Sequence, residues 1–237
     1  MCGRYVQASS PELLVERFGV ERLQLPEQPG EREPDYNVAP RKPVPGVIQR
    51  DQRVLEELRW GLIPSWATDP RIGDRLINAR AETVLEKPAF QHAFRKKRCI
   101  LPADGFYEWE AVPGQKRKRA VFVHARDGEP FAFAGLWEVW RDPSERDAGW
   151  LPTCTIVTTR ANALLQPVHD RMPVILPETA WDEWLDPTNE DVAGLSQLLV
   201  PFPDRLIEMW AVGSAVNDAN NNGPELLAPV EQAQLFE

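Results

Sequence analysis

The sequence has few cysteines and no long apolar run. Its three cysteines, Cys2, Cys99 and Cys154, lie far apart, without a CxxC pair or a histidine at ligand spacing, so neither a disulfide framework nor a structural zinc site is expected. No apolar segment approaches the roughly 18 residues that a membrane-spanning helix needs, and the first residues lead into no secretory signal. We therefore predict a soluble protein of a reducing, cytoplasmic compartment.

The sequence also has fewer basic than acidic residues. The formal net charge of −9 argues at first against a nucleic-acid partner, because phosphate binding draws on Lys and Arg. The acidity is concentrated, however: residues 177–237 hold 12 acidic residues and one basic residue, Arg205, so residues 1–176 carry a net charge of +2. Two basic runs, 95–98 and 116–119, lie in this first part, and such runs are more often solvated faces than contact sites.

The most reactive group that the chain offers is Cys2, which becomes the amino terminus once Met1 is removed. Its amine, with a pKa of about 7.7 to 8.0, and its thiol, at about 8.5, would then form a 1,2-aminothiol. Such a group can attack an amide as a terminal nucleophile. It can also capture an aldehyde, the amine forming an imine that the thiol closes to a thiazolidine. Taken alone, Cys2 is more simply explained as an ordinary second-position cysteine.

The composition and the apolar patterns indicate one domain with a central sheet. At 237 residues and 43% hydrophobic content, the chain can bury one large core. A capping serine at position 9 or 10, Pro11 and a terminal Gly19 predict a short helix, and the proline-rich stretch 25–46 predicts a loop. Apolar and β-branched content predicts strands at 53–60, 99–101, 106–109, 120–125, 131–137, 153–159 and 206–212. Short helices are predicted within 84–97, with a break at Pro88, and at 179–186 and 191–199.

Polar residues stand within these apolar segments. If 76–83 is a strand, Asn78, Arg80 and Glu82 share one face, which is costly to bury and is therefore either solvated or functional. Aromatic residues flank Glu108 on both sides, a setting that could raise the pKa of its carboxyl group into the range for acid–base work. An outward-facing strand residue explains Glu108 equally well.

Two further segments carry possible ligand-binding side chains. His169 and Arg171 stand two residues apart in an extended, proline-bounded segment. A lone histidine is usually structural, but beside Arg171 it could form an anion site or an acid–base group. Trp66 lies in a loop bounded by glycine and proline, where core packing and stacking on a nucleobase are about equally plausible.

Eight short motifs follow one another along the chain: CGRY at 2–5, YNVAP at 36–40, WGLIP at 60–64, INARAET at 77–83, RCI at 98–100, GFYEW at 105–109, FAGLW at 133–137 and HDRMP at 169–173. Together they resemble the SOS response-associated peptidase (SRAP) family, whose members include bacterial and human abasic-site processing proteins. The resemblance covers residues 2 to about 226.

The resemblance implies a fold and an activity. The fold would be a single compact α+β domain of residues 1–226, built on a curved, largely antiparallel, barrel-like sheet with short flanking helices, before a polar tail of residues 227–237. Family members crosslink the ring-opened aldehyde of an abasic site in single-stranded DNA to the terminal cysteine as a thiazolidine, which shields the lesion during the DNA damage response. The implied partners are single strands with abasic sites and replication-fork junctions. The protein would act as a monomer, without a membrane, a metal or an organic cofactor.

The same resemblance implies roles for particular residues. Cys2 would be the nucleophile, Asn78 would hold the sugar and the terminal amine, Glu108 would move protons, and His169 would assist opening of the sugar ring and contact phosphate. The DNA-binding residues would be Arg4, Asn37, Pro40, Trp66, Arg80 and Arg171. Two places depart from the usual pattern: Asp35 stands where relatives often have a basic residue, and the loop 217–222 lacks Lys and Arg. Both departures predict weaker or more salt-sensitive DNA binding.

Two other functions remain compatible with these residues. One is an N-terminal-nucleophile cysteine peptidase, in which Cys2 attacks an amide with His169 or Glu108 as base, and which could remove Met1 autoproteolytically. The other is a non-catalytic single-strand nucleic-acid-binding module, which keeps Trp66 and the arginines but gives Cys2 no role.

Overall fold

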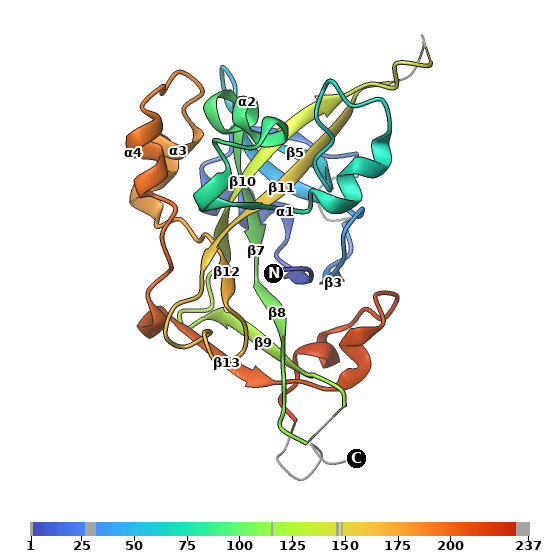
Figure 1. Ribbon diagram of the computed structural model, residues 1–237, viewed down its shortest axis with the longest axis vertical. Helices are drawn as coiled ribbons and strands as arrows, with labels where there is room; N and C mark the ends of the chain where they lie inside the picture. Colours follow the sequence, from blue (N-terminus) through green and yellow to red (C-terminus); the bar gives the residue numbers. More distant parts are fainter. Residues whose placement is uncertain (1, 27–31, 115, 146, 148, 231–237) are drawn as a thin grey trace.

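Two β-sheets share one core in the computed structural model, which describes residues 2–26, 32–114, 116–145, 147 and 149–230 (Figure 1). The strands are β1 (Tyr5–Gln7), β2 (Arg22–Gln24), β3 (Asp35–Val38), β4 (Pro43–Gln49), β5 (Arg53–Trp60), β6 (Asn78–Arg80), β7 (Arg98–Ala103), β8 (Gly105–Glu110), β9 (Arg119–Ala125), β10 (Phe131–Trp140), β11 (Leu151–Arg160), β12 (Arg171–Pro173) and β13 (Ile207–Ala211). The α-helices are α1 (Pro11–Phe18), α2 (Pro88–Lys96), α3 (Trp181–Leu185) and α4 (Val192–Gln197). None of the helices in these described ranges is long and apolar enough to cross a membrane.

The larger sheet closes on itself as a five-stranded barrel. Its neighbours run β5-β4-β7-β10-β11 in antiparallel pairs, and β11 then pairs with β5 in parallel, with Cys154 opposite Trp60. Strands β2, β6 and β12 extend the sheet at its edges. Buried apolar side chains such as Leu58, Leu101 and Phe133 fill the core between the sheets. The predicted α+β fold with a barrel-like, largely antiparallel sheet is confirmed.

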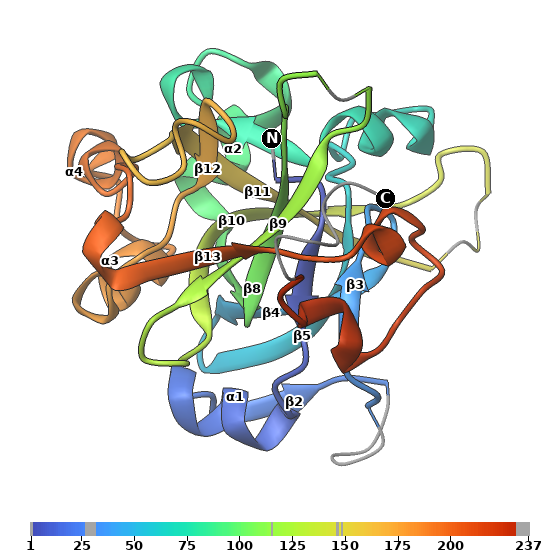
Figure 2. The same cartoon turned by 90° about the horizontal axis from the view of Figure 1, so that it is seen from below.

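The smaller sheet has the order β13-β9-β8-β1-β3 and is antiparallel throughout (Figure 2). Its short strand β1 packs onto the barrel, where the Tyr5 ring lies 5.2 Å from the Trp60 ring and 6.0 Å from the Phe133 ring. Phe106 and Ile207 from the same sheet join this core. The amino-terminal segment is therefore held between the two sheets.

Local sequence signals account for some of the predicted elements and fail for others. The helix α1 begins and ends as predicted, because the Ser10 hydroxyl accepts a hydrogen bond from the Leu13 amide and Gly19 closes it with a φ of 61°. The predicted helix is not broken at Pro88. Pro88 is instead the first residue of α2, where its missing N–H removes no intrahelical hydrogen bond.

The prediction of a loop over 25–46 was wrong where the structure describes it. The strands β3 and β4 lie in this stretch. Pro43 and Pro45 pair with β5 on one side, whereas β7 joins the other side of β4 only from Val47 onward. At its proline-containing end β4 is thus an edge strand, where a missing backbone donor is tolerated.

Residues 213–230, which we call the C-terminal strap, cross the outer face of the smaller sheet. Val216 and Leu226 are buried there. The Val230 amide donates to the Ala211 carbonyl at 3.0 Å, beside an isolated bridge between Val212 and Pro229. The predicted domain boundary at residue 226 falls inside this strap, and residues 231–237 of the predicted tail lie outside the described residues.

Candidate active site and nucleic-acid interface

Cys2 lies fully buried immediately before β1. The Asn78 side-chain amide donates to the Cys2 carbonyl at 2.8 Å. Asn78 is carried there by β6, which pairs in parallel with the barrel strand β11 so that Asn78 stands opposite Ile156. On the other side the Tyr107 amide donates to the Arg4 carbonyl at 3.0 Å, which aligns the segment with β8. The two sheets thus fix the backbone of the predicted nucleophile.

A carboxylate at the other end of β1 anchors the same segment. Asp104 accepts hydrogen bonds from the amides of Ala8 at 2.6 Å and Ser9 at 2.9 Å, and from the Ser9 hydroxyl. Bonds to a charged acceptor are stronger than neutral ones. The sequence carries no local signal for this anchor, because the partners of Asp104 lie about a hundred residues earlier in the chain.

Glu108 is 2% exposed and sits in β8. Burial raises the pKa of its carboxyl group, and the electrostatic influence of His169 and Lys118 acts in the opposite direction. The raised pKa agrees in direction with the sequence argument.

The His169 ring is oriented by its own segment. Its Nδ1 atom accepts a hydrogen bond from the Arg171 amide at 2.9 Å and lies 3.0 Å from the Asp170 carboxylate. A ring nitrogen that accepts carries no proton, so the neutral ring has its proton on Nε2. The histidine can therefore present an N–H donor on its far side.

The surroundings of the Cys2 thiol disfavour its ionised form. Burial raises the pKa of Cys2, and the Glu108 carboxylate raises it further. Cysteines that act as thiolate nucleophiles have lowered pKa values, from a positively charged or helix-terminal environment. The pKa of Cys2 is instead raised by its surroundings.

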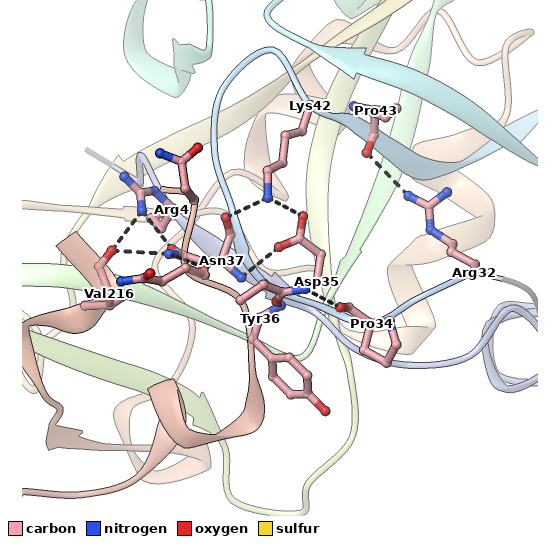
Figure 3. Close-up of polar contacts among 12 residues, drawn as sticks. Arg4, Arg32, Pro34, Asp35, Tyr36, Asn37, Lys42, Pro43 and Val216 are labelled. Carbon is pink, nitrogen blue, oxygen red and sulfur yellow. Dashed lines mark hydrogen bonds and ion pairs between the residues drawn. The ribbon is translucent and has the colours of Figure 1, made fainter. Parts of the chain in front are cut away.

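Arg4 and Asn37 form an internal anchor for the C-terminal strap (Figure 3). The Arg4 Nη1 atom donates to Asn37 Oδ1 at 2.7 Å and to the Val216 carbonyl at 2.9 Å. The Asn37 amide nitrogen donates to the carbonyls of Val216, Asp218 and Asn221 at 3.3, 2.9 and 3.0 Å. Asn37 is 0% exposed. This burial argues against the predicted direct contact of Asn37 with DNA.

The two departures from the family pattern are compensated inside the protein. The Lys42 ammonium lies 2.6 Å from the Asp35 carboxylate, which supplies a cation close to the acidic position (Figure 3). In the loop 217–222, the Asn222 side chain accepts from the Tyr36 amide at 2.7 Å and donates to the Pro34 carbonyl at 2.9 Å. Its side chain therefore pairs with the edge of β3 as a further strand would.

The predicted phosphate contacts Arg80 and Arg171 differ in availability. Arg171 makes two bonds to the Glu82 carboxylate, at 2.7 and 2.9 Å, and one to the Thr158 carbonyl at 2.6 Å, and these bonds lower the pKa of Glu82. Arg80 is exposed. The expected common face is only partly present, because β6 ends at Arg80 and Glu82 belongs to the 3-10 helix η2 (Ala81–Thr83).

The two remaining predicted DNA contacts lie at the surface. Trp66 is 60% exposed in the turn that follows β5. Pro40 is half-buried before β4, next to Arg41, which has a φ of 77°. Within the described part of the chain, no group of three or more His, Cys, Asp or Glu side chains is placed to hold a metal ion.

Residues 1–219 match the family model described as SOS response associated peptidase (SRAP). The chain belongs to the SRAP family. The abasic site processing protein YoqW of Bacillus subtilis (strain 168) is 45% identical over 228 residues, which cover 96% of this chain and 99% of that protein. The abasic site processing protein HMCES of Pongo abelii is 30% identical over 98% of this chain and 77% of its own length.

A solved structure shares the fold of this chain. The X-ray structure of a Bacteroides thetaiotaomicron protein superposes with a TM-score of 0.87 and 25% identity, covering 97% of this chain and 100% of that one. The family match ends at residue 219, inside the C-terminal strap, whose contacts with β13 continue to Val230.

Proposed function

We propose that this SRAP protein processes abasic sites in single-stranded DNA by a covalent crosslink to Cys2, formed after removal of Met1, and so protects the lesion during the DNA damage response. The observation that carries the proposal is the fixed backbone of Cys2, held by Asn78 and lying beside the buried carboxyl group of Glu108. The relatives named abasic site processing proteins support the choice of substrate.

The proposed reaction begins with the sugar. The His169 Nε2–H side assists opening of the abasic sugar to its aldehyde. The Cys2 amine then adds to the aldehyde carbon, and the resulting carbinolamine loses water to give an imine. The Cys2 sulfur adds to the imine carbon, its proton moves to the nitrogen, and the thiazolidine ring closes. One water molecule is released overall, and nothing is oxidised or reduced.

Glu108 would carry protons in two of these steps. Because burial raises the pKa of this carboxyl group, Glu108 can hold a proton closer to neutral pH than an exposed glutamate does. It would donate that proton to the departing hydroxyl group of the carbinolamine and take back the proton that the nitrogen loses as the imine forms. As the sulfur adds, it would protonate the ring nitrogen and accept the thiol proton, which restores the protonated carboxyl group. Asn78 would keep the terminal residue in place meanwhile.

The character of the Cys2 thiol favours aldehyde capture over the peptidase alternative. A cysteine peptidase attacks with a thiolate, and the raised pKa of Cys2 disfavours that form. In aldehyde capture the amine attacks first, and the sulfur closes the ring as a neutral thiol. The same site can therefore perform the second reaction without an activated thiolate.

Intact-mass measurement before and after mixing with an abasic single strand tests the proposal. We expect a heat-stable adduct at the protein mass plus the oligonucleotide mass minus one water, and none with an undamaged strand. A variant with one residue inserted before Cys2, which blocks the amine but keeps the thiol, is the matched control and should give no stable adduct. A heat-stable adduct at wild-type yield from this control would refute the mechanism, since the thiol alone would then suffice.

A second arm of the same experiment tests the form of the DNA. The exposed Trp66 and Arg80 suit an extended strand, and unstacking a lesion inside a continuous duplex adds a few kcal/mol. The adduct yield should therefore be higher on single strands and on junctions than on continuous duplex at matched salt. Equal yields would contradict the single-strand part of the proposal.

A further inference from the structure

The two basic runs of the sequence have different surroundings. In the first run, Lys96 lies 2.5 Å from Glu190, Lys97 pairs with Glu138, and Arg98 is buried and donates to main-chain carbonyls of α2 and α3. Three of the four residues of this run, Lys96, Lys97 and Arg98, therefore have partners within the protein.

The second basic run, residues 116–119, has different surroundings. Lys116, Arg117 and Lys118 are exposed, and no residue in the described ranges forms a hydrogen bond or an ion pair with them. Only Arg119, at the base of the run, is neutralised, by Glu110. Three adjacent cations thus stand uncompensated at one end of the β8–β9 hairpin, and this loop extends beyond the body of the smaller sheet (Figure 1).

Strand register connects this basic tip to the candidate site. Glu108 stands opposite Val121 and Glu110 opposite Arg119, and paired residues of antiparallel strands share a face. Glu108 and the Glu110–Arg119 ion pair therefore lie on the same face, two residues or about 7 Å apart along the strand. The charge of Lys118 also acts on the Glu108 carboxyl group, in agreement with this register.

We propose that the hairpin tip formed by Lys116, Arg117 and Lys118 is a phosphate clamp that binds the backbone of the nucleic-acid strand flanking the lesion. The proposal rests on the proposed function, because it assumes a strand that enters the site beside Glu108. Exposed cations without internal partners can neutralise phosphates and release counterions, and they do so without regard to base sequence. Continuity with the site favours this occupant over an acidic protein surface.

Salt dependence of binding tests the clamp. The variant Lys116→Gln/Arg117→Gln/Lys118→Gln removes three charges. The control Arg22→Gln/Lys87→Gln/Arg95→Gln removes three exposed charges, from β2, from the residue preceding α2 and from α2. Binding of a fluorescent, undamaged single strand would be followed by anisotropy between 50 and 200 mM salt. Each phosphate contact on a single strand contributes about 0.7 to the magnitude of the slope of log K against log salt. Losing three contacts should therefore lower that magnitude by about 2 in the tip variant. Between 50 and 200 mM salt, the tip variant should then lose about 15-fold less affinity than the wild type.

The outcomes separate this inference from the proposed function. An unchanged slope in the tip variant, an equal fall in the control, or no binding of the strand by the wild type would each overturn the clamp. The abasic adduct is measured independently on the wild type. If the wild type forms the adduct while the slope stays unchanged, only the clamp fails. If the tip variant lowers the slope while the wild type forms no adduct, the clamp stands and the proposed chemistry fails.

Discussion

Replacing Asn37 with alanine tests whether this residue anchors the C-terminal strap. Its side chain is buried, donates to the Asp218 and Asn221 carbonyls at 2.9 and 3.0 Å, and accepts from the Arg4 guanidinium at 2.7 Å. Two neutral hydrogen bonds contribute about 1 kcal/mol each, and a bond to a charged group contributes about 1.5 kcal/mol. The substitution should therefore lower the free energy of unfolding by about 3 kcal/mol.

Urea denaturation measures this loss. With a slope of about 3 kcal/mol per molar urea, the upper end of the range for small proteins, the midpoint of Asn37→Ala should fall by about 1 M. Asn220→Ala is the matched control, because Asn220 is an exposed strap residue whose amide contacts only the Asp218 carboxylate. Its effect should stay within about 0.5 kcal/mol.

Hydrogen exchange locates the effect. In Asn37→Ala the amides of the strap should exchange faster than in the wild type, while those of the barrel strands keep their order of protection. A stability loss in Asn37→Ala no larger than that in Asn220→Ala would refute the anchoring role. The strap carbonyls would then form other hydrogen bonds in the variant without a loss in the free energy of unfolding.

Three further outcomes follow from the site. Burial raises the pKa of Glu108 above its unfolded value, so the native state binds more protons than the unfolded state in the window above about pH 4.3, and stability falls as pH rises through it. Glu108→Gln lacks this fall and should be more stable than the wild type at pH 8 but not at pH 4; an equal offset in urea unfolding at both values would contradict the argument. Cys2→Ser keeps the terminal amine and should give an imine that borohydride traps but no adduct that survives heating; a heat-stable adduct at wild-type yield would show that sulfur is not needed. Glu82→Gln removes the carboxylate that neutralises Arg171 and should tighten binding of single strands at low salt, measured by anisotropy; unchanged affinity would mean that Arg171 makes no phosphate contact.

The parts of the fold that could be predicted depend on local signals. The helix α1 has its cap, its first-turn proline and its terminal glycine within ten consecutive residues, Ser10 to Gly19. The strands β5, β9 and β13 follow from apolar content within single segments. The barrel closure has no local signal and was expected only from the family resemblance, because the parallel pairing of β11 with β5 joins residues about 95 positions apart. The strand β4 was missed because its prolines suit an edge that only the pairing reveals.

The same contrast between local signals and long-range contacts applies to the candidate site. The resemblance pointed to Cys2 and Asn78, which the structure joins by a hydrogen bond, and to Glu108 and His169, which it places within electrostatic reach. The roles of all four stay predictions. The internal partners of the DNA-binding candidates had no local signal: the strap carbonyls lie 179 to 184 positions from Asn37, and Glu82 lies 89 positions from Arg171.

Several carboxylates of the acidic C-terminal quarter form ion pairs with bases of the earlier part of the chain. The ion pairs are Arg17–Glu178, Arg53–Asp182, Lys96–Glu190 and Arg126–Glu208. The bases that lack such partners include Arg80 and the hairpin tip. At 0.1 M salt, charges separated by more than about 10 Å are largely screened. A strand in contact with the uncompensated cations therefore responds to them rather than to the net charge of the chain, and its affinity depends on which arginines and lysines the C-terminal acids leave unpaired.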